Sequence, residues 1–180
     1  MSPLDVQVAP ARMVDVPDIV ALVERFARRG EVLPRPPEEV YQTLREWVVA
    51  RQGDRLVGCA SLVILWADLA EIRSLVVLPD QQGKGVGRRL VTAVLHQATE
   101  LEIPQVFALT RKPGFFAKLG FHPVARETLP RKIWKDCIHC IKFVGCDEVA
   151  FIRDVAARPA PHMASAIQVP APAASGNGHT

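Results

Sequence analysis

The chain has 180 residues, of which 49% are hydrophobic and 23% are charged, a balance that predicts one soluble globular domain with a sizeable core. Its formal net charge of +3 is too small to indicate nucleic-acid binding by itself, and no apolar run approaches the length of a membrane span. The N-terminal segment has neither the basic nor the apolar region of a signal peptide, so we expect a cytoplasmic protein.

The first part of the chain predicts one strand and two helices. Apolar residues favour a strand over residues 6–14, although Pro10 interrupts it. Asp15 is a good N-cap residue for a helix whose apolar positions recur every three or four residues as far as Gly30. A proline-broken loop follows, and residues 38–46 predict a short second helix.

Three strands then predict an antiparallel meander. Residues 47–51, 55–66 and 69–78 are separated only by short turns. The third of them is the central strand, and its apolar end, residues 75–78, suits a buried position. Three glycines at every second position come soon after it, followed by an amphipathic helix over residues 87–101.

The glycine-rich loop combines three features of an anion site. Gly83, Gly85 and Gly87 let the backbone approach a ligand closely and adopt positive φ values. The N–H groups at a helix start have no intrahelical partner, and the helix dipole adds partial positive charge there. Lys84 and Arg88 add full positive charges, so the loop predicts binding of a phosphate or pyrophosphate.

The second half of the chain predicts a crossover. Residues 105–110 form the next strand, and the intervening helix makes that strand parallel to residues 75–78. A short helix follows, in which Phe115 is expected to be a core residue, and residues 121–124 begin another strand. From residue 156 onward alanine and proline dominate without an amphipathic period, which predicts a disordered tail.

The glycine loop fits neither of two common phosphate-binding fingerprints. Gly85 stands where a P-loop needs serine or threonine, and Arg88 stands where the Rossmann fingerprint needs its last glycine. The pattern [QR]-x-x-G-x-[GA], met by Gln82, Gly85 and Gly87, resembles the acetyl-CoA loop of the Gcn5-related N-acetyltransferase superfamily. The stretch PGFFAKLGFHPV resembles the second half of the same core. The alternative is a glycine-rich turn before an ordinary helix.

This resemblance implies an α/β (α+β) fold with a mixed, mostly antiparallel central sheet flanked by helices. Two parallel strands splay in that fold, and the pantetheine of acetyl-CoA, the implied co-substrate, enters the gap between them. The acetyltransferase domain should cover residues 1–155, and the Ala/Pro-rich tail residues 156–180. The expected cofactor-binding residues are Leu75, Val76, Val77, Gln82, Gly83, Lys84, Gly85, Val86, Gly87, Arg88 and Phe116.

A longer resemblance indicates the acceptor. Residues 70–80, 114–121 and 129–151 resemble the acetyltransferase domain of bacterial N-acetylglutamate synthases, above all in the stretch LPRKIWKDCIHC. The resemblance implies acetylation of L-glutamate, the first step of arginine biosynthesis. Long members of that family carry an N-terminal amino-acid-kinase-like domain that binds arginine. This chain resembles the short, stand-alone form, for which we expect no inhibition through such a domain.

The implied chemistry is attack of an α-amine on a thioester. The amine must lose a proton, and Glu71 on the central strand is the expected base; alternatively, Glu71 is a surface carboxylate paired with Arg73. A backbone N–H at residues 75–77, freed by a strand bulge that the resemblance implies, would stabilise the oxyanion. Phe116 stands where many relatives place a tyrosine acid, so the thiolate must leave without that help.

Glutamate carries two carboxylates, so its pocket needs cations, and we expect Arg73, Arg111 and Lys132 to hold them. Arg73 is the first candidate for binding a carboxylate, because alternation along the strand places it on one face with Glu71 and Leu75. Other acceptors stay open, namely another amino acid, a small amine or a protein N-terminus, and so does a non-catalytic acyl-CoA sensor. We expect no nucleic-acid or membrane partner, and the superfamily resemblance offers a homodimer as one option.

Four cysteines suggest two further hypotheses. Cys137, Cys140 and Cys146, with His139, have a spacing that fits zinc poorly because a second pair is missing. We therefore expect no metal, and we interpret these cysteines as reduced thiols on strands. Cys59 raises the hypothesis of a covalent cysteine route, but no base is evident beside it. Direct attack of the amine is the expected mechanism.

Overall fold

The structure, a computed structural model, describes residues 6–129, 137–139 and 145–155. Its centre is a seven-stranded sheet in the order β1-β2-β3-β4-β5-β7-β6, in which every neighbouring pair is antiparallel except β4 and β5. This mixed, mostly antiparallel sheet confirms the predicted fold class. The strands are β1 (Val6–Pro10), β2 (Trp47–Gln52), β3 (Arg55–Trp66), β4 (Leu69–Val77), β5 (Gln105–Thr110), β6 (His122–Val124) and β7 (Val149–Asp154).

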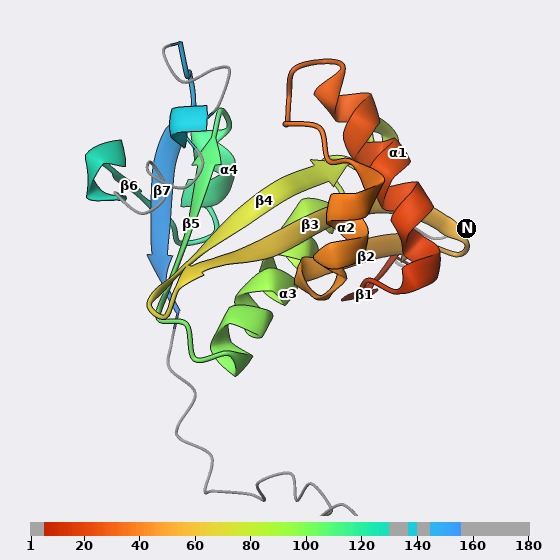
Figure 1. Cartoon of the computed structure of the whole chain (residues 1–180), viewed down its shortest axis with the longest axis horizontal. Helices are drawn as coiled ribbons and strands as arrows, with labels where there is room; N and C mark the ends of the chain where they lie inside the picture. The colour runs from red at the N-terminus through yellow and green to blue at the C-terminus, as the bar shows by residue number, and fades with distance from the viewer. Residues whose placement is uncertain (1–5, 130–136, 140–144, 156–180) are drawn as a thin grey trace, which may run out of the picture.

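Four α-helices in the described residues flank the sheet (Figure 1). They are α1 (Val16–Ala27), α2 (Pro37–Gln42), α3 (Val86–Glu100) and α4 (Pro113–Ala117). Helices α1 and α2 cover one face of the β2–β4 meander, and α3 packs on the other face. Gly58 on β3 makes room for α3, because a Cβ atom there would lie 3.0 Å from Leu90 Cδ1 and 2.9 Å from the Val76 carbonyl oxygen.

The parallel pair of β4 and β5 is short. Residues 69–71 pair with residues 105–107, and beyond these the two strands diverge (Figure 1). The predicted parallel pair is confirmed, but its predicted position on β4, at residues 75–78, is wrong. The 15-residue α3 spans about 22 Å and returns the chain along the length of β4, so β5 starts beside the first residues of β4. The sheet therefore opens beyond Glu71.

Strand β4 carries one extra residue relative to β3. Between the paired residues Arg73–Ser61 and Val76–Cys59, β4 has two residues whereas β3 has one. This arrangement is a β-bulge, in which the extra residue has no partner on the neighbouring strand. The bulge that the family resemblance implies is therefore present.

The bulge also changes which residues of β4 share a face. Paired residues project to the same face, and each extra residue shifts the alternation by one. Val76, rather than Leu75, therefore shares the face of Glu71 and Arg73. The prediction that Leu75 lies on that face is wrong because it assumed an unbroken alternation.

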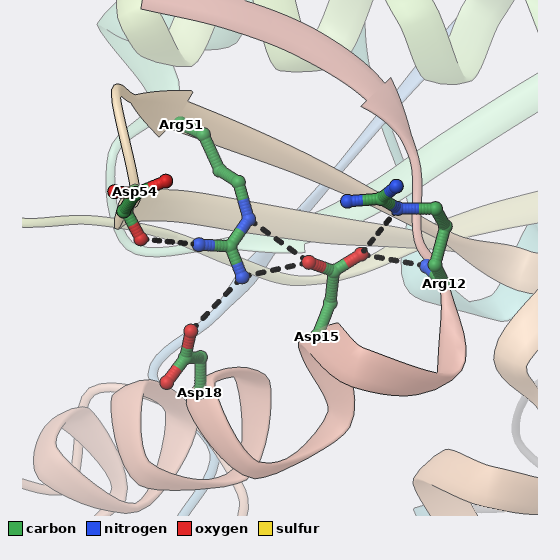
Figure 2. Close-up of polar contacts among 5 residues, drawn as sticks. All are labelled: Arg12, Asp15, Asp18, Arg51 and Asp54. Atoms are coloured by element: carbon green, nitrogen blue, oxygen red, sulfur yellow. Dashed lines mark hydrogen bonds and ion pairs between the residues drawn. The ribbon is translucent and has the colours of Figure 1, made fainter.

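The start of the chain differs from the prediction at Asp15. β1 ends at Pro10, which lacks an N–H for the ladder, and a 3-10 turn at Met13–Asp15 replaces the rest of the predicted strand. The Asp15 side chain does not cap α1. It accepts the Arg12 backbone N–H at 2.7 Å and two Arg51 N–H bonds at 2.9 and 2.7 Å (Figure 2). Charge-assisted bonds outweigh a helix cap, and they tie α1 to the β2–β3 hairpin.

Other differences are local. The helix predicted over residues 38–46 breaks at Thr43, whose hydroxyl donates to the Glu39 carbonyl, and a 3-10 turn follows α2. Strand β7 was not predicted, and Cys137 lies on a 3-10 turn rather than a strand. The predicted tail, residues 156–180, lies outside the described residues. In the described part of the chain, no helix has the length and apolarity that a membrane crossing needs.

Candidate active site

A cavity of about 660 Å³ opens where β4 and β5 separate. It lies between β4, the glycine loop, the segment from the end of β5 into α4, and the connection from α1 to α2. The predicted site residues that line it are Glu71, Arg73, Leu75, Val76, Val77, Gln82, Gly83, Gly85, Gly87, Arg88, Arg111 and Phe116. Lys84 and Val86 are not among the lining residues, and Lys132 lies outside the described residues.

The glycine loop forms one end of the cavity. Gly83 and Gly85 have φ values of 75° and 84°, which favour glycine, and Gly85 directly precedes α3. The Gln82 side-chain amide donates to the Val77 carbonyl at 2.9 Å and so holds the loop against the end of β4. The first N–H groups of α3 and the nearby exposed Arg88 make this end suitable for a phosphate group.

Aromatic side chains form a second wall. A Cβ atom on Gly87 would lie 3.3 Å from the Phe115 ring, so glycine lets this ring close against the start of α3. Phe116 packs edge to face against both Phe115 and Phe121, with ring centroids 5.2 Å apart in each of these two pairs. Phe116 is buried whereas Phe115 is only partly buried, so Phe116 is the core residue of the two, contrary to the prediction. Neither ring carries a proton that a thiolate can accept.

Glu71 lies in the cavity wall at the point where β4 and β5 cease to pair. The residue is 4% exposed, and its carboxylate accepts a hydrogen bond of 2.5 Å from Arg73 Nε. The ion pair that the sequence offered as an alternative is present, but it involves a buried carboxylate rather than a surface one. The pair fixes the position of the Glu71 carboxylate within the cavity lining.

Arg35 is a lining residue that the sequence analysis missed. It comes from the loop before α2, and its side chain is only 17% exposed. Its Nη1 donates to Glu39 at 2.9 Å, and its Nε donates to the Ser74 hydroxyl at 3.4 Å. Arg35 and Arg73 together line both the main cavity and a second hollow of about 170 Å³ beside α2. No local motif marks Arg35, because only the folded topology brings its loop to β4.

Arg111 reaches the cavity from the end of β5 but already has partners. Its guanidinium donates to the Gly30 carbonyl and lies 3.8 Å from the Asp147 carboxylate. It thus joins the segment after α1 to the segment before β7. Its predicted role as a substrate ligand stays a prediction, as does that of Lys132.

The charge of the cavity lining is predominantly positive. Seven arginine and lysine residues line it, against three glutamates. Such a cavity attracts anionic ligands. The glycine loop at one end has the features of an anion site, and the guanidinium groups of Arg35 and Arg73 are donors of the kind that bind carboxylates.

Cys59, the residue of the covalent hypothesis, is poorly suited to act as a nucleophile. Cys59 is fully buried on β3, and burial raises the pKa of its thiol far above the ordinary value, which opposes thiolate formation. Cys137 is buried and Cys146 is partly exposed, and both line the cavity. Cys140 lies outside the described residues. Among the residues that the structure describes, no group of three or more His, Cys, Asp or Glu side chains is placed so that it could hold a metal ion.

Comparison with known proteins gives concordant matches. Residues 19–121 match the sequence model of the acetyltransferase (GNAT) family. An uncharacterized N-acetyltransferase of Chlorobaculum tepidum is 36% identical over 153 residues, 85% of this chain and 99% of that protein. An amino-acid acetyltransferase of Mycobacterium tuberculosis is 38% identical over 130 residues, 70% of this chain and 74% of that protein.

Among solved structures, this chain is similar in fold to an N-acetylglutamate synthase from Neisseria gonorrhoeae. That synthase was crystallised with coenzyme A and N-acetyl-glutamate, and it matches with a TM-score of 0.73 and 27% sequence identity. The match covers 84% of this chain but 35% of that one, so the two proteins correspond over one part of the longer chain.

Proposed function

The chain belongs to the acetyltransferase (GNAT) family, and on that premise we propose that it transfers the acetyl group of acetyl-CoA to the α-amine of L-glutamate. Family membership makes it an acetyl-CoA-dependent N-acetyltransferase, as the glycine loop and the aromatic stretch predict. The amino-acid acceptor is supported by the M. tuberculosis relative, and glutamate by the N-acetyl-glutamate in the N. gonorrhoeae structure. The same proposal assigns the chain to the first step of arginine biosynthesis in the cytoplasm.

The observation that carries the acceptor assignment is the pair of arginines beside Glu71. The side chains of Arg35 and Arg73 are 17% and 14% exposed, and both line the cavity on the acceptor side of the bulge. A guanidinium has five N–H donors and binds a carboxylate while it keeps another partner. A dicarboxylate supplies two anionic groups to such a pair, whereas a neutral amine supplies none.

The proposed reaction uses groups that meet at the bulge. Glu71 takes a proton from the ammonium of the acceptor, directly or through water, and the amine attacks the thioester carbonyl carbon. An N–H group that the bulge releases from the β3–β4 ladder stabilises the negative charge on the carbonyl oxygen.

The tetrahedral intermediate then collapses to the amide. The C–S bond breaks, coenzyme A leaves as a thiolate, and the remaining excess proton on nitrogen reaches the thiolate through water. A thiol with an ordinary pKa near 8.5 leaves as an anion without a dedicated acid. This accords with Phe116, which stands where a tyrosine acid is common in the family and has no proton to give.

Coenzyme A release, followed with a thiol reagent across a panel of amino acids, tests the acceptor. We expect glutamate to react fastest, and glutamine, which is almost isosteric but lacks the side-chain charge, to react much more slowly. If glutamine or an unrelated amine is a far better substrate than glutamate, the acceptor assignment fails while the acetyltransferase assignment stands. Binding of acetyl-CoA without release by any amine would instead indicate an acyl-CoA sensor.

Two substitutions test the arginine pair. Arg35→Ala and Arg73→Ala should each raise the KM for glutamate about ten- to a hundredfold, because a lost charge-assisted bond costs about 1.5–3 kcal/mol. The KM for acetyl-CoA should stay the same. Arg28→Ala is the matched control, since that side chain is 77% exposed, pairs with Glu24 on its own helix turn and is not among the cavity-lining residues.

A further inference from the structure

The bulge residue Ser74 has an unusual backbone conformation. Its φ is 49°, and Glu102 is the only other non-glycine residue with a positive φ in the described ranges. An L-residue in this region is disfavoured and persists only when its surroundings hold it. Ser74 is also 9% exposed and lines the cavity.

Two contacts hold Ser74. The Cys59 thiol on β3 donates to the Ser74 carbonyl with an S···O distance of 3.9 Å. Arg35 Nε donates to the Ser74 hydroxyl at 3.4 Å. The Cys59 contact holds the main chain of Ser74 from the core, where Cys59 is fully buried. The Arg35 contact holds the side chain of Ser74 from the cavity.

The orientation of Ser74 determines where the next N–H groups point. Leu75, Val76 and Val77 follow it directly, and all three line the cavity. A rotation about the Ser74 backbone would turn these groups away from a thioester oxygen in the cavity. Stabilisation of an oxyanion by N–H donors depends on short, well-aligned bonds, so a displacement of about 1 Å is costly.

We propose that Cys59 is a positioning residue for acetyl transfer, which acts by holding the carbonyl of the left-handed bulge residue Ser74. This rests on the proposed function, in that the bulge is taken to supply the oxyanion donor. Under this proposal the buried Cys59 thiol contributes to the reaction without acting as a nucleophile. Because the bulge acts on the intermediate rather than on the bound substrates, a loss of this contact lowers kcat and leaves both KM values unchanged.

A double-mutant cycle tests the proposal. Cys59→Ala should lower kcat about tenfold. The same substitution in a Ser74→Gly background should lower kcat less than twofold further, because glycine adopts positive φ without being held. Val57→Ala is the matched control: Val57 is fully buried on the same strand, β3, and is not among the cavity-lining residues, so its truncation should lower the melting temperature and leave kcat unchanged.

Independent effects of Cys59→Ala and Ser74→Gly would overturn the proposal, as would an unchanged kcat in Cys59→Ala. So would a loss of kcat in Val57→Ala that matches the loss in Cys59→Ala, since packing alone would then explain both. If Cys59→Ala does not fold, Cys59→Ser replaces it in the cycle; its shorter C–O bond weakens the same contact, and the same dependence on Ser74 is expected. The cycle is measured with whichever amine the wild type acetylates best, so a failure of the glutamate assignment does not decide it.

Discussion

Glu71 is the residue whose chemistry is simplest to isolate. Glu71→Gln keeps the shape of the side chain and removes the proton acceptor. Turnover with glutamate should fall about a hundredfold near neutral pH, because general-base catalysis contributes at least this much. Part of the loss should return as the pH rises, since more of the acceptor is then a free amine. Steady-state rates from pH 6 to pH 10 measure this.

The control for Glu71→Gln is Glu24→Gln, on a half-exposed carboxylate that pairs with Arg28. It should leave the rate unchanged at every pH. If Glu71→Gln stays within twofold of the wild type at neutral pH, Glu71 serves only as a partner of Arg73.

A substitution at Gly85 tests the proposed cofactor-binding end of the cavity separately from the acceptor end. Gly85→Asp should weaken coenzyme A binding more than tenfold, because it places a negative charge at the start of α3 where the pyrophosphate is expected. Calorimetry measures the affinity. Gly53→Asp is the matched control: both glycines have positive φ and open space at the Cβ position, but Gly53 lies in the β2–β3 turn. Equal affinity in Gly85→Asp and wild type would place the phosphates elsewhere.

Single residues were predictable where the cause is local. Spacing alone predicts the glycine loop, because conformational freedom and helix-start N–H groups depend on adjacent residues. The prediction of which sheet face Leu75 occupies was wrong, because one bulge residue reverses the alternation of side chains along β4. Arg35 could not be predicted, since its contact with Ser74 joins residues 39 positions apart in the sequence.

Among the elements, α1 is joined to the β2–β3 hairpin by a buried ion pair. Burial lowers the pKa of Arg51, but its hydrogen bonds to Asp15 and Asp18 outweigh this, so the pKa lies above its ordinary value (Figure 2). The arginine is therefore charged at any working pH, and its removal leaves Asp15, whose side chain is 2% exposed, without this partner.

Arg51→Ala should lower the free energy of unfolding by about 3 kcal/mol, the lower end for breaking a buried pair, because Arg51 is itself partly exposed. Urea denaturation measures the change. Asp18→Asn removes the exposed partner of the same arginine, whose side chain is 53% exposed, and should cost less than about 1 kcal/mol. Equal losses of unfolding free energy in the two variants would show that the burial of Asp15 does not increase the cost of removing its partner.

The sequence predicts whether a segment is a helix or a strand better than it predicts how that segment is placed against its neighbours. Apolar periodicity predicts the meander, α3 and the crossover to β5. The register of β4 and β5 depends on how far α3 carries the chain back, which is a property of the assembled layers. Asp15 illustrates the same limit, since its preference for capping a helix yields to an arginine 36 residues away.

For the whole molecule, a truncation after Val155 should keep both turnover and melting temperature. Val155 makes the last described contact of the domain, a hydrogen bond from its N–H to the Pro104 carbonyl at 2.7 Å. Residues 156–180 combine low charge with no amphipathic period. The contrasting truncation, after Glu148, also removes β7 and should not yield a folded protein. A folded protein that ends at Val155 but has lost turnover would assign the tail a catalytic role.

The place of β7 between β5 and β6 has a consequence for synthesis on the ribosome. Strand β6 leaves the ribosome before β7, yet within the described residues it pairs with β7 and with no other strand. The β1–β4 meander and α3 can close as they emerge, since their partners precede them, whereas β6 must wait. A nascent chain stalled with β7 still inside the exit tunnel should therefore not retain coenzyme A, and one stalled after β7 has emerged should retain it. Retention by the shorter nascent chain would show that the cavity forms without the completed sheet.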